Sequence, residues 1–327
     1  MTLLWLPPLA ALLAVAACGA YLKLARHWQL LDHPNHRSSH SLPTPHGGGV
    51  PLLLSLAVAV LAAGGFGVAW SAELRWLLGF ALALMALGVL DDLVGLSVRL
   101  RFAVYALCCL VAAALLMAPL GPLAWWLLLP VGFALLWGLN LFNFMDGIDG
   151  IAAIQCFMAS CAAALLAFFH TGAGEYALFC LLLGFCHLGF LAWNFPPARL
   201  FMGDAGSVPT GFLLGALAVL GEVSGALSAA TWLVLLAAFV ADASYTLLRR
   251  LLRGERITEA HREHLYQRLS RRWHSHLAVD LALLATMALW LFPLAWAVQT
   301  FEQYRLFLVI LAYLPPLIYM AKSADFT

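Results

Sequence analysis

Acidic residues stand at the ends of long apolar stretches in this sequence, where they could bind a cation or a phosphorylated ligand. The five that share this position are Asp91, Asp92, Asp146, Asp149 and Asp204. Ionisable groups at membrane depth are costly and tend to mark functional sites. Carboxylates gathered on one face would repel one another unless a cation or a positive substrate compensates. Solvated charges at helix ends are the alternative, which suits a lone Asp better than five.

The densest polar motif is Asn-Leu-Phe-Asn-Phe-Met-Asp-Gly-Ile-Asp-Gly at residues 140–150. Its glycines let the backbone pass close to a ligand, and Asn143, Asp146 and Asp149 offer polar groups to a hydroxyl-rich partner. A turn followed by an Asp-capped helix gives the same pattern. The two interpretations are compatible, since a helix N-terminus is itself an anion site.

A second Gly/Asp loop, Arg-Leu-Phe-Met-Gly-Asp-Ala-Gly-Ser at residues 199–207, opens a later apolar stretch. Asp204 is expected at or just before the start of that helix. Phe201 is either a stacking surface for a base or an anchor that holds the loop in the membrane.

Two other loops carry positive charge. Arg37 and several histidines give the loop at residues 32–51 a phosphate-binding character, and its prolines and glycines suit a fixed, non-helical course. The loop at 249–276 is strongly basic and contains His261, His264 and Arg268. His261 and His264 face one side of a helix, but no third metal ligand stands at the usual spacing. An anion-binding surface is therefore predicted, with anchoring to acidic lipids as the alternative.

An acidic pocket faced by basic loops suits a divalent cation together with a phosphorylated ligand. Mg²⁺ favours one or two carboxylates, with phosphate oxygens and waters completing its octahedron.

The elements that position these residues are predicted to be membrane helices. Of the 327 residues, 64% are hydrophobic and 10% are charged, whereas soluble domains are about 45–50% apolar and about a quarter charged. Apolar stretches of roughly 17–22 residues recur, each long enough to cross a hydrocarbon core of ~30 Å as a helix. The alternating segments of a membrane β-barrel are absent from the sequence. We therefore expect an all-α integral membrane protein, folded as one polytopic domain over residues 1–327.

About eleven transmembrane helices are expected, or ten if the final apolar stretch is not a span. The predicted spans are 3–22, 50–69, 75–92, 103–120, 123–140, 150–169, 175–194, 207–221, 228–248, 278–298 and 304–321. With the N-terminus outside, every Lys and Arg except Arg75 and Arg305 falls on the inner side, as the positive-inside rule requires. The same topology places all five carboxylates, and hence the active site, on the cytoplasmic face.

Five blocks, in order along the chain, resemble the polyprenyl-phosphate N-acetylhexosamine-1-phosphate transferases, which form glycosyltransferase family 4. They are Pro-Thr-Pro-His-Gly-Gly, Asp91-Asp92, the motif at 140–150, Phe-Met-Gly-Asp-Ala-Gly-Ser, and the His-containing last loop. The resemblance runs from Asp32 to about Arg268. The family includes the phospho-MurNAc-pentapeptide translocase and the GlcNAc-1-phosphate transferases that start O-antigen, common-antigen and teichoic-acid linkage synthesis.

The resemblance implies that a UDP-N-acetylhexosamine donates sugar-1-phosphate to undecaprenyl phosphate, with release of UMP. It implies three catalytic residues. Asp204 would bind Mg²⁺, for which Mn²⁺ can substitute, and Asp91 would lie near the lipid phosphate as base or orienting group, with Asp92 beside it. The implied substrate-binding residues are Asn143, Asp146, Asp149, Asn194, Phe201 (stacked on uracil), His261, His264 and Arg268. Arg37 is a further candidate, from the phosphate-binding character of the first basic loop.

The sequence departs from the pentapeptide translocases at two places. It has His261-x-x-His264 where they carry three consecutive histidines, and it lacks the lysine that commonly precedes their Pro-Thr-Pro loop. Both favour the O-antigen-initiating branch, in the inner membrane of a bacterium. Membrane lipids are then expected as surroundings, nucleic acid is not a partner, and a homodimer is left open.

The rival hypothesis is a multi-span lipid-headgroup or ion-coupled transporter or flippase, which would use Asp242 and His187 within the spans. Transporters often show internal repeats and paired helix breaks at the midplane, which this sequence lacks. For the enzyme, the two residues are expected to be buried polar groups bonded to neighbouring helices.

Overall fold

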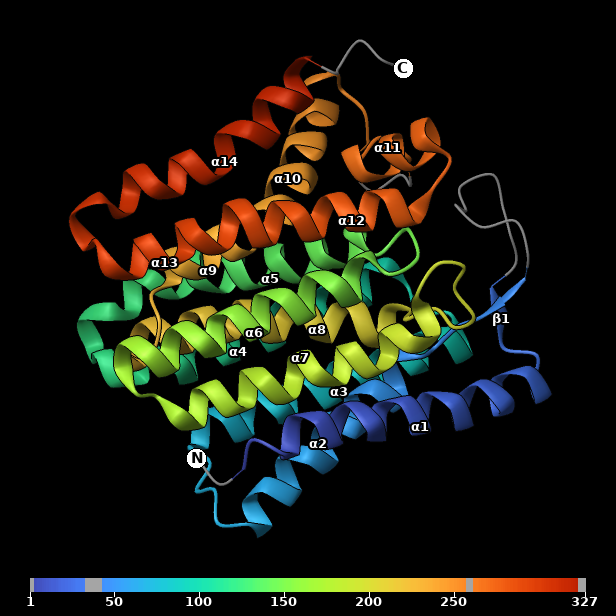
Figure 1. Ribbon diagram of the computed structural model, residues 1–327, viewed down its shortest axis with the longest axis horizontal. Helices are drawn as coiled ribbons and strands as arrows, with labels where there is room; N and C mark the ends of the chain where they lie inside the picture. Colours follow the sequence, from blue (N-terminus) through green and yellow to red (C-terminus); the bar gives the residue numbers. More distant parts are fainter. Residues whose placement is uncertain (1–2, 33–42, 257–260, 323–327) are drawn as a thin grey trace.

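Helices make up nearly all of the structure, a computed structural model that describes residues 3–32, 43–256 and 261–322. Most of them lie side by side in one bundle (Figure 1). The helices are α1 (Leu6–His27), α2 (Gly49–Gly65), α3 (Ala72–Val94), α4 (Val98–Met117), α5 (Leu128–Met145), α6 (Ile151–Thr171), α7 (Gly174–Asn194), α8 (Asp204–Ser224), α9 (Ala229–Leu235), α10 (Ala237–Leu252), α11 (Leu265–Trp273), α12 (His276–Thr286), α13 (Phe292–Thr300) and α14 (Arg305–Lys322).

Short elements complete the described part of the chain. Three 3₁₀ turns, η1 (Ala118–Leu120), η2 (Pro122–Leu127) and η4 (Glu302–Tyr304), join helices, and a π-helical turn, η3 (Met287–Leu291), continues α12 into α13. Strands β1 (Leu31–Asp32) and β2 (Thr44–Pro45) form one antiparallel pair.

The structure confirms an all-α membrane protein. Nine helical segments of the described chain are long and apolar enough to cross a membrane, and the pair α9–α10 adds a tenth if the two form one bent span. The remaining predicted span, at 50–69, corresponds to α2, which has only 17 residues. Each predicted span therefore falls on helix, and α2 is the one that does not reach the length of the others.

The ninth predicted span is not a straight helix, because α9 and α10 meet at 75°. Gln155 of α6 donates to the carbonyl of Leu235 at 3.1 Å, at the end of α9. A helix break frees backbone carbonyls, and a polar side chain from a neighbouring helix is a common way to satisfy them inside a membrane.

Helix α8 lies in the core of the bundle. Of its most apolar 18-residue stretch, 72% is buried inside the protein, against 11% for the same stretch of α14. Small residues let neighbours approach α8 closely, as is usual between membrane helices. A Cβ added to Gly88 of α3 would come within 2.6 Å of the Ala205 Cα, and one added to Gly49 would overlap the backbone of Gly206. These glycines bring α2 and α3 against the first turn of α8.

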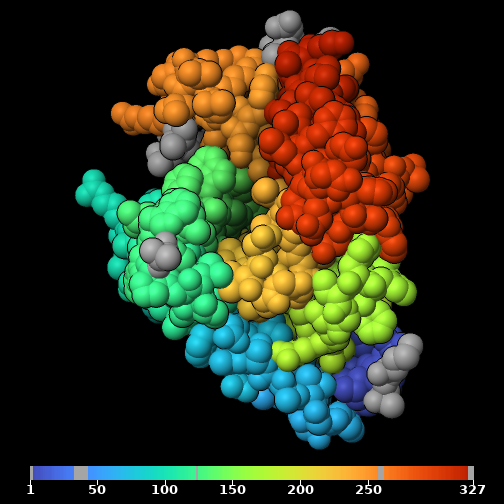
Figure 2. Space-filling model, turned by 90° about the vertical axis from the view of Figure 1, so that its left-hand side faces the viewer, coloured from blue at the N-terminus to red at the C-terminus, as the bar shows by residue number. Residues whose placement is uncertain are grey.

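One end of the bundle gathers the polar loops, at the right of Figure 1. The end of α1, the β-strand pair, the α3–α4 turn, the α5–α6 turn, the α7–α8 loop and α11 all lie there. Figure 2 shows the opposite end, where the segments around residues 70, 120, 170, 230 and 300 meet. Chain segments carrying all five carboxylates thus reach the same end, as the alternating topology predicts.

Candidate active site

The turn between α3 and α4 brings a carboxylate and a guanidinium together. Asp91 Oδ1 accepts from the Leu96 backbone N–H at 2.8 Å, and Gly95 takes the left-handed conformation (φ 66°) that ends α3. Ser97 then caps α4 by accepting from Leu100 N–H at 3.2 Å. The chain therefore re-enters the bundle with Arg101 one turn into α4, where its guanidinium bonds Asp91 Oδ2.

The same guanidinium reaches a third element. Arg101 Nη1 lies 3.2 Å from Asp204 Oδ2, at the first residue of α8. Arg101 thus bridges two of the three predicted catalytic carboxylates. Its side chain is 25% exposed, against 14% for Asp91 and 36% for Asp204, so the cluster is open on the Asp204 side.

Asp92 faces the loop that precedes α2. His46 Nδ1 lies 3.7 Å from Asp92 Oδ2, and both side chains are partly exposed. The residues before α2 also pair with the loop that opens α8. Phe201 N–H donates to the Pro45 carbonyl at 2.8 Å, and Gly48 N–H donates to the Phe201 carbonyl at 2.9 Å. The Pro-Thr-Pro-His-Gly-Gly block and the Phe-Met-Gly-Asp block are therefore one joined structure.

Asn143, at the end of α5, is tied to the start of α8. Ser207 Oγ donates to Asn143 Oδ1 at 2.5 Å. Beyond it, Asp146 lies within electrostatic reach of both Asp204 and Asp149. Burial, and then the charges of these two carboxylates, raise the pKa of Asp146 well above its ordinary value. Asp146 connects the Arg101 cluster to a second polar group around Asp149.

Asp149 and Asn194 hold the turn before α6 against the α7–α8 loop. The Ala198 backbone N–H donates to Asp149 Oδ2 at 3.0 Å. Gly150 N–H donates to Asn194 Oδ1 at 2.9 Å, and Asn194 Nδ2 donates to the Leu200 carbonyl at 3.0 Å. Asn194 is buried and fixes two backbones, while Asp149 stays partly exposed. His276 of α12 completes the group, with Nδ1 at 3.2 Å from Asp149 Oδ2.

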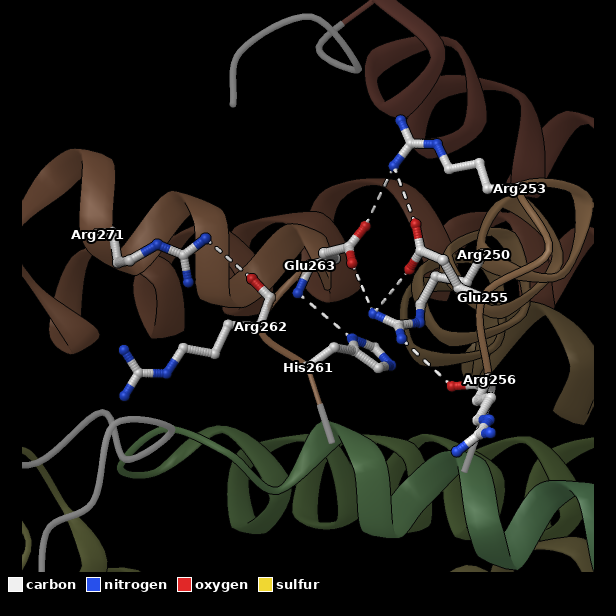
Figure 3. Close-up of polar contacts among 8 residues, drawn as sticks. All are labelled: Arg250, Arg253, Glu255, Arg256, His261, Arg262, Glu263 and Arg271. Atoms are coloured by element: carbon white, nitrogen blue, oxygen red, sulfur yellow. Dashed lines mark hydrogen bonds and ion pairs between the residues drawn. The ribbon is translucent and has the colours of Figure 1, made fainter. Parts of the chain in front are cut away.

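The basic last loop carries two separate groups of polar contacts (Figure 3). Arg250 pairs with Glu263 at 2.6 Å and with Glu255 at 3.2 Å, while Arg253 lies 3.5 Å from Glu263. On the other side, Arg271 Nη2 donates to the Arg262 carbonyl at 2.9 Å.

A cleft of about 590 Å³ opens beside Arg262 and Arg271. Its lining residues are Asp149, Pro196, Pro197, Arg262, Ser270, Arg271, His274, Ser275, His276 and Leu277. Part of the loop's positive charge thus meets Asp149, whereas Arg250 and Arg253 are held by the two glutamates.

His261 and His264 of the last loop differ in their surroundings. His264 is buried, with Nδ1 at 3.5 Å from Asp242 Oδ1, and its ring stacks near Phe144 and Tyr266. His261 is only partly buried, and its ring centroid lies 4.8 Å from that of His264. Burial, reinforced by the neighbouring charges of His264 and Arg250, lowers the pKa of His261 to about 4.

The residues that a transporter would recruit are bonded within the bundle. Asp242 accepts from the backbone N–H groups of Leu265 and Tyr266, at 2.7 and 3.0 Å, and so fixes the start of α11. His187 contacts the Leu183 carbonyl and Thr210 Oγ1, at 2.9 and 3.0 Å. The prediction that both are buried polar groups bonded to neighbouring elements is confirmed.

Oxygen donors suitable for Mg²⁺ surround the start of α8. Asp204, Asp92 and Asn143 all lie there, and hard oxygen ligands are the ones that this cation prefers. Within the described residues, no group of three His, Cys, Asp or Glu side chains converges as a complete metal cage. A site with one or two carboxylates, completed by substrate phosphates, fits this donor set.

Of the other predicted site residues, Phe201 is partly exposed at the joined loops, and Arg268 lies in α11, also partly exposed. Arg37 lies outside the described residues. Sequence reasoning missed Arg101 and His276. Arg101 stands at the start of a span, ten residues after Asp91, and its basic charge next to a carboxylate pair was the available signal.

The fold and this site define a multi-span membrane protein with an acidic, arginine-bridged site at one end of its helices. Comparison with known proteins agrees with this class. Residues 74–222, which include Asp91, Asp149 and Asp204, match the model of glycosyl transferase family 4.

Three relatives show how far the similarity extends. A decaprenyl-phosphate N-acetylglucosaminephosphotransferase of Mycolicibacterium smegmatis is 30% identical over 305 residues, which cover 82% of this chain and 75% of the relative. A probable undecaprenyl-phosphate N-acetylglucosaminyl 1-phosphate transferase of Bacillus subtilis is 27% identical, over 75% of this chain and 71% of the relative. A phospho-N-acetylmuramoyl-pentapeptide-transferase of Phenylobacterium zucineum is 40% identical over 111 residues, 30% of each chain. The chain belongs to glycosyl transferase family 4, the polyprenyl-phosphate N-acetylhexosamine-1-phosphate transferases.

Proposed function

We propose that this enzyme transfers N-acetylhexosamine 1-phosphate from a UDP-sugar to undecaprenyl phosphate and releases UMP. The observation that carries the proposal is the convergence of Asp91, Arg101 and Asp204 from three helices at the end where the other family motifs meet. The names of the relatives, which pair a polyprenyl phosphate with an N-acetylglucosamine 1-phosphate group, support the same reaction.

The reaction exchanges one phosphoanhydride for another. An oxygen of the lipid phosphate attacks the sugar-bearing β-phosphorus, a new P–O bond forms, and the bond from that phosphorus to the bridging oxygen breaks. UMP leaves with the bridging oxygen and its electron pair. The protein therefore has to align two anions and offset their charge, which is the main task in phosphoryl transfer.

Arg101 and its two carboxylates fit this task. Two like charges ~4 Å apart repel by about 4 kcal/mol at an effective dielectric of ~20. A guanidinium already held between two helices can turn its remaining N–H groups to phosphate oxygens, because it carries five donors. Asp91, bonded to Arg101 and to Leu96 N–H, orients that guanidinium, so we assign Asp91 a positioning role rather than that of a base.

Mg²⁺ is proposed as the cofactor, with Asp204 as its protein ligand and Asp92 beside it. When bound, the ion would supply Lewis-acid stabilisation of the diphosphate charge. Asp204 holds its carboxylate at the opening of the α8 first turn, where the helix N-terminus also favours phosphate. Mn²⁺ is expected to substitute, since it accepts the same oxygen ligands.

The donor is proposed to lie between the Arg101 cluster and the cleft beside Asp149. In this arrangement Asn143, Asp146 and Asp149 bind its sugar and nucleoside groups, Asn194 fixes the loops that hold them, and Phe201 stacks on uracil. His261, His264 and Arg268 would close the sugar end, and Arg37 stays a predicted phosphate-binding residue. His264 would act through its contact with Asp242, because its own ring is buried.

We further propose that the site faces the cytoplasm from the inner membrane of a bacterium, with the N-terminus outside. The distribution of Lys and Arg supports this orientation, and UDP-sugars are cytoplasmic metabolites. The product would begin O-antigen or another envelope polysaccharide.

The test is UMP release by detergent-purified protein with undecaprenyl phosphate, Mg²⁺ and a panel of UDP-N-acetylhexosamines. Release that depends on lipid, stops with EDTA and occurs with one sugar would establish the reaction and identify the donor. Folded protein that releases no UMP but moves lipid between leaflets would refute the proposal.

A further inference from the structure

The start of α12 places a histidine against the α5–α6 turn. Ser275 caps the helix by accepting from Ala278 N–H at 3.1 Å, which makes His276 the first helical residue. From there the ring reaches across to Asp149, which stands 127 positions earlier in the sequence. The contact joins the start of α12 to the Asp-Gly-Ile-Asp-Gly motif.

Two contacts hold the Asp149 carboxylate, and both fall on the same oxygen. His276 Nδ1 lies 3.2 Å from Oδ2, and Ala198 N–H donates to Oδ2 at 3.0 Å. The Asp149 backbone N–H donates to the same Nδ1 at 3.4 Å, so one ring nitrogen contacts both the backbone and the carboxylate of Asp149. His276 therefore positions Asp149 through its backbone N–H and its carboxylate together, and Oδ1 is the oxygen left for a ligand.

The backbone next to Asp149 is fixed from other directions. Gly150 N–H is bonded to Asn194, and a Cβ on Gly150 would lie 2.5 Å from Asp280 Oδ2. Asp280 is fully buried one turn after His276 on α12. Because Gly150 is held by Asn194, loss of the His276 ring would free the Asp149 side chain and its backbone N–H while leaving Gly150 in place.

Asp149 and His276 are also neighbours in the lining of the 590 Å³ cleft, together with the cationic Arg262 and Arg271. A carboxylate oxygen in a cleft that is otherwise rich in cations and hydroxyls selects a ligand with both an N–H or O–H donor and a negative charge. A nucleotide has both.

We propose that His276 is a positioning residue of the donor site, which holds Asp149 so that its carboxylate accepts from a donor group of the bound nucleotide. The inference rests on the proposed function, because it takes the nucleotide-sugar as the ligand. It adds a residue that lies beyond Arg268, where the family resemblance ends, and outside the matched residues 74–222. Its effect should appear in nucleotide binding rather than in the chemical step.

The test compares His276→Ala, His276→Asn and wild type in UMP release and in equilibrium binding of UMP by calorimetry. Asn keeps a polar amide near the place of Nδ1, whose oxygen can still accept from the Asp149 N–H, whereas Ala removes the contact. His276→Ala should raise the KM for the UDP-sugar and the Kd for UMP about tenfold, the usual scale for a lost charge-assisted contact. Its kcat and its KM for the lipid should stay within about twofold of wild type, and His276→Asn should restore most of the binding.

His170→Asn is the matched control. His170 bonds the Leu166 carbonyl and Thr300 Oγ1 at the far end of α6, so its loss should leave UMP binding unchanged. If His276→Ala binds UMP as wild type does, or if Ala and Asn both lower kcat without changing KM, the inference is wrong while the proposed function stands. If wild-type protein neither binds UMP nor releases it, the proposed function itself is wrong. If His276→Ala does not fold, folded His276→Asn tests the inference instead. A tenfold loss of UMP affinity, or a tenfold rise in the KM for the UDP-sugar, in that variant would contradict positioning by a hydrogen bond.

Discussion

The guanidinium of Arg101 in α4 lies 3.2 Å from the carboxylate of Asp204, the first residue of α8. It also bonds Asp91 at the end of α3, so one cation joins three helices at the candidate site. In a substrate-free protein this cation offsets carboxylates that would otherwise repel one another. When phosphates enter, the same group can hold them.

Replacing Arg101 with Ala should lower kcat/KM by about 100-fold or more, on the scale of lost electrostatic stabilisation in other active sites. Arg101→Lys should keep part of the activity, because an ammonium supplies charge without the planar fork. Steady-state UMP release measures both. Arg99→Ala is the matched control, since Arg99 is exposed two residues earlier, and it should behave as wild type. Equal losses in the two alanine variants would mean that only general positive charge matters.

Asp204→Asn should lose most turnover, roughly 100-fold or more, because an amide is a weaker ligand for a divalent cation than a carboxylate. Excess Mg²⁺ should not restore the rate. A titration of UMP release against Mg²⁺ is the measurement, with Glu222→Gln at the far end of α8 as control. Near-normal turnover in Asp204→Asn would show that Asp204 is not the metal ligand.

Phe201→Ala should raise the KM for the UDP-sugar about tenfold, the scale of a lost base–aromatic stack. Its kcat should fall much less, because the contact would be equal in ground and transition states. Phe201→Tyr, which keeps the ring, serves as the control. An unchanged KM in Phe201→Ala would mean that this side chain packs against the protein and does not stack on the base.

His261 gives a pH prediction. Its pKa in the folded protein is lowered to about 4, whereas an unfolded histidine titrates near 6.5. Between these values the unfolded chain binds more protons, so this residue destabilises the fold increasingly as the pH falls from about 6.5 to about 4. The difference in melting temperature between His261→Gln and wild type should therefore become more favourable to the variant as the pH falls from about 6.5 to about 4. A difference that is constant with pH would show that His261 does not titrate in this way.

Much of the arrangement was predictable from the sequence. Apolar length and the positions of Lys and Arg were enough to expect helices that bring the Asp91, Asp146 and Asp204 segments to one end, and the structure confirms that gathering. The glycine-rich loops were expected to follow non-helical courses near a ligand. Gly47 and Gly48 do precede the helix and lie against the α7–α8 loop, whereas Gly49 already begins α2.

Other relationships depend on packing between elements that are distant in sequence. Arg101 stands ten positions from Asp91 and 103 from Asp204, and only the α3–α4 turn aims it at both. The pattern of His261 and His264 predicts a shared helix face, but His264 instead lies before α11, buried on Asp242. The bend between α9 and α10 coincides with a Gln155 contact from another helix, which no local pattern shows.

The central claim is that phosphate moves with the sugar, and the fate of the β-phosphate tests it most directly. Purified protein would receive undecaprenyl phosphate, Mg²⁺ and a UDP-N-acetylhexosamine labelled at the β-phosphorus, and the lipid would be extracted. We predict that the label enters the lipid fraction in amounts equal to the UMP released, and that Asp204→Asn transfers little. Sugar that reaches the lipid while the labelled phosphate stays with the nucleotide as UDP would contradict the account.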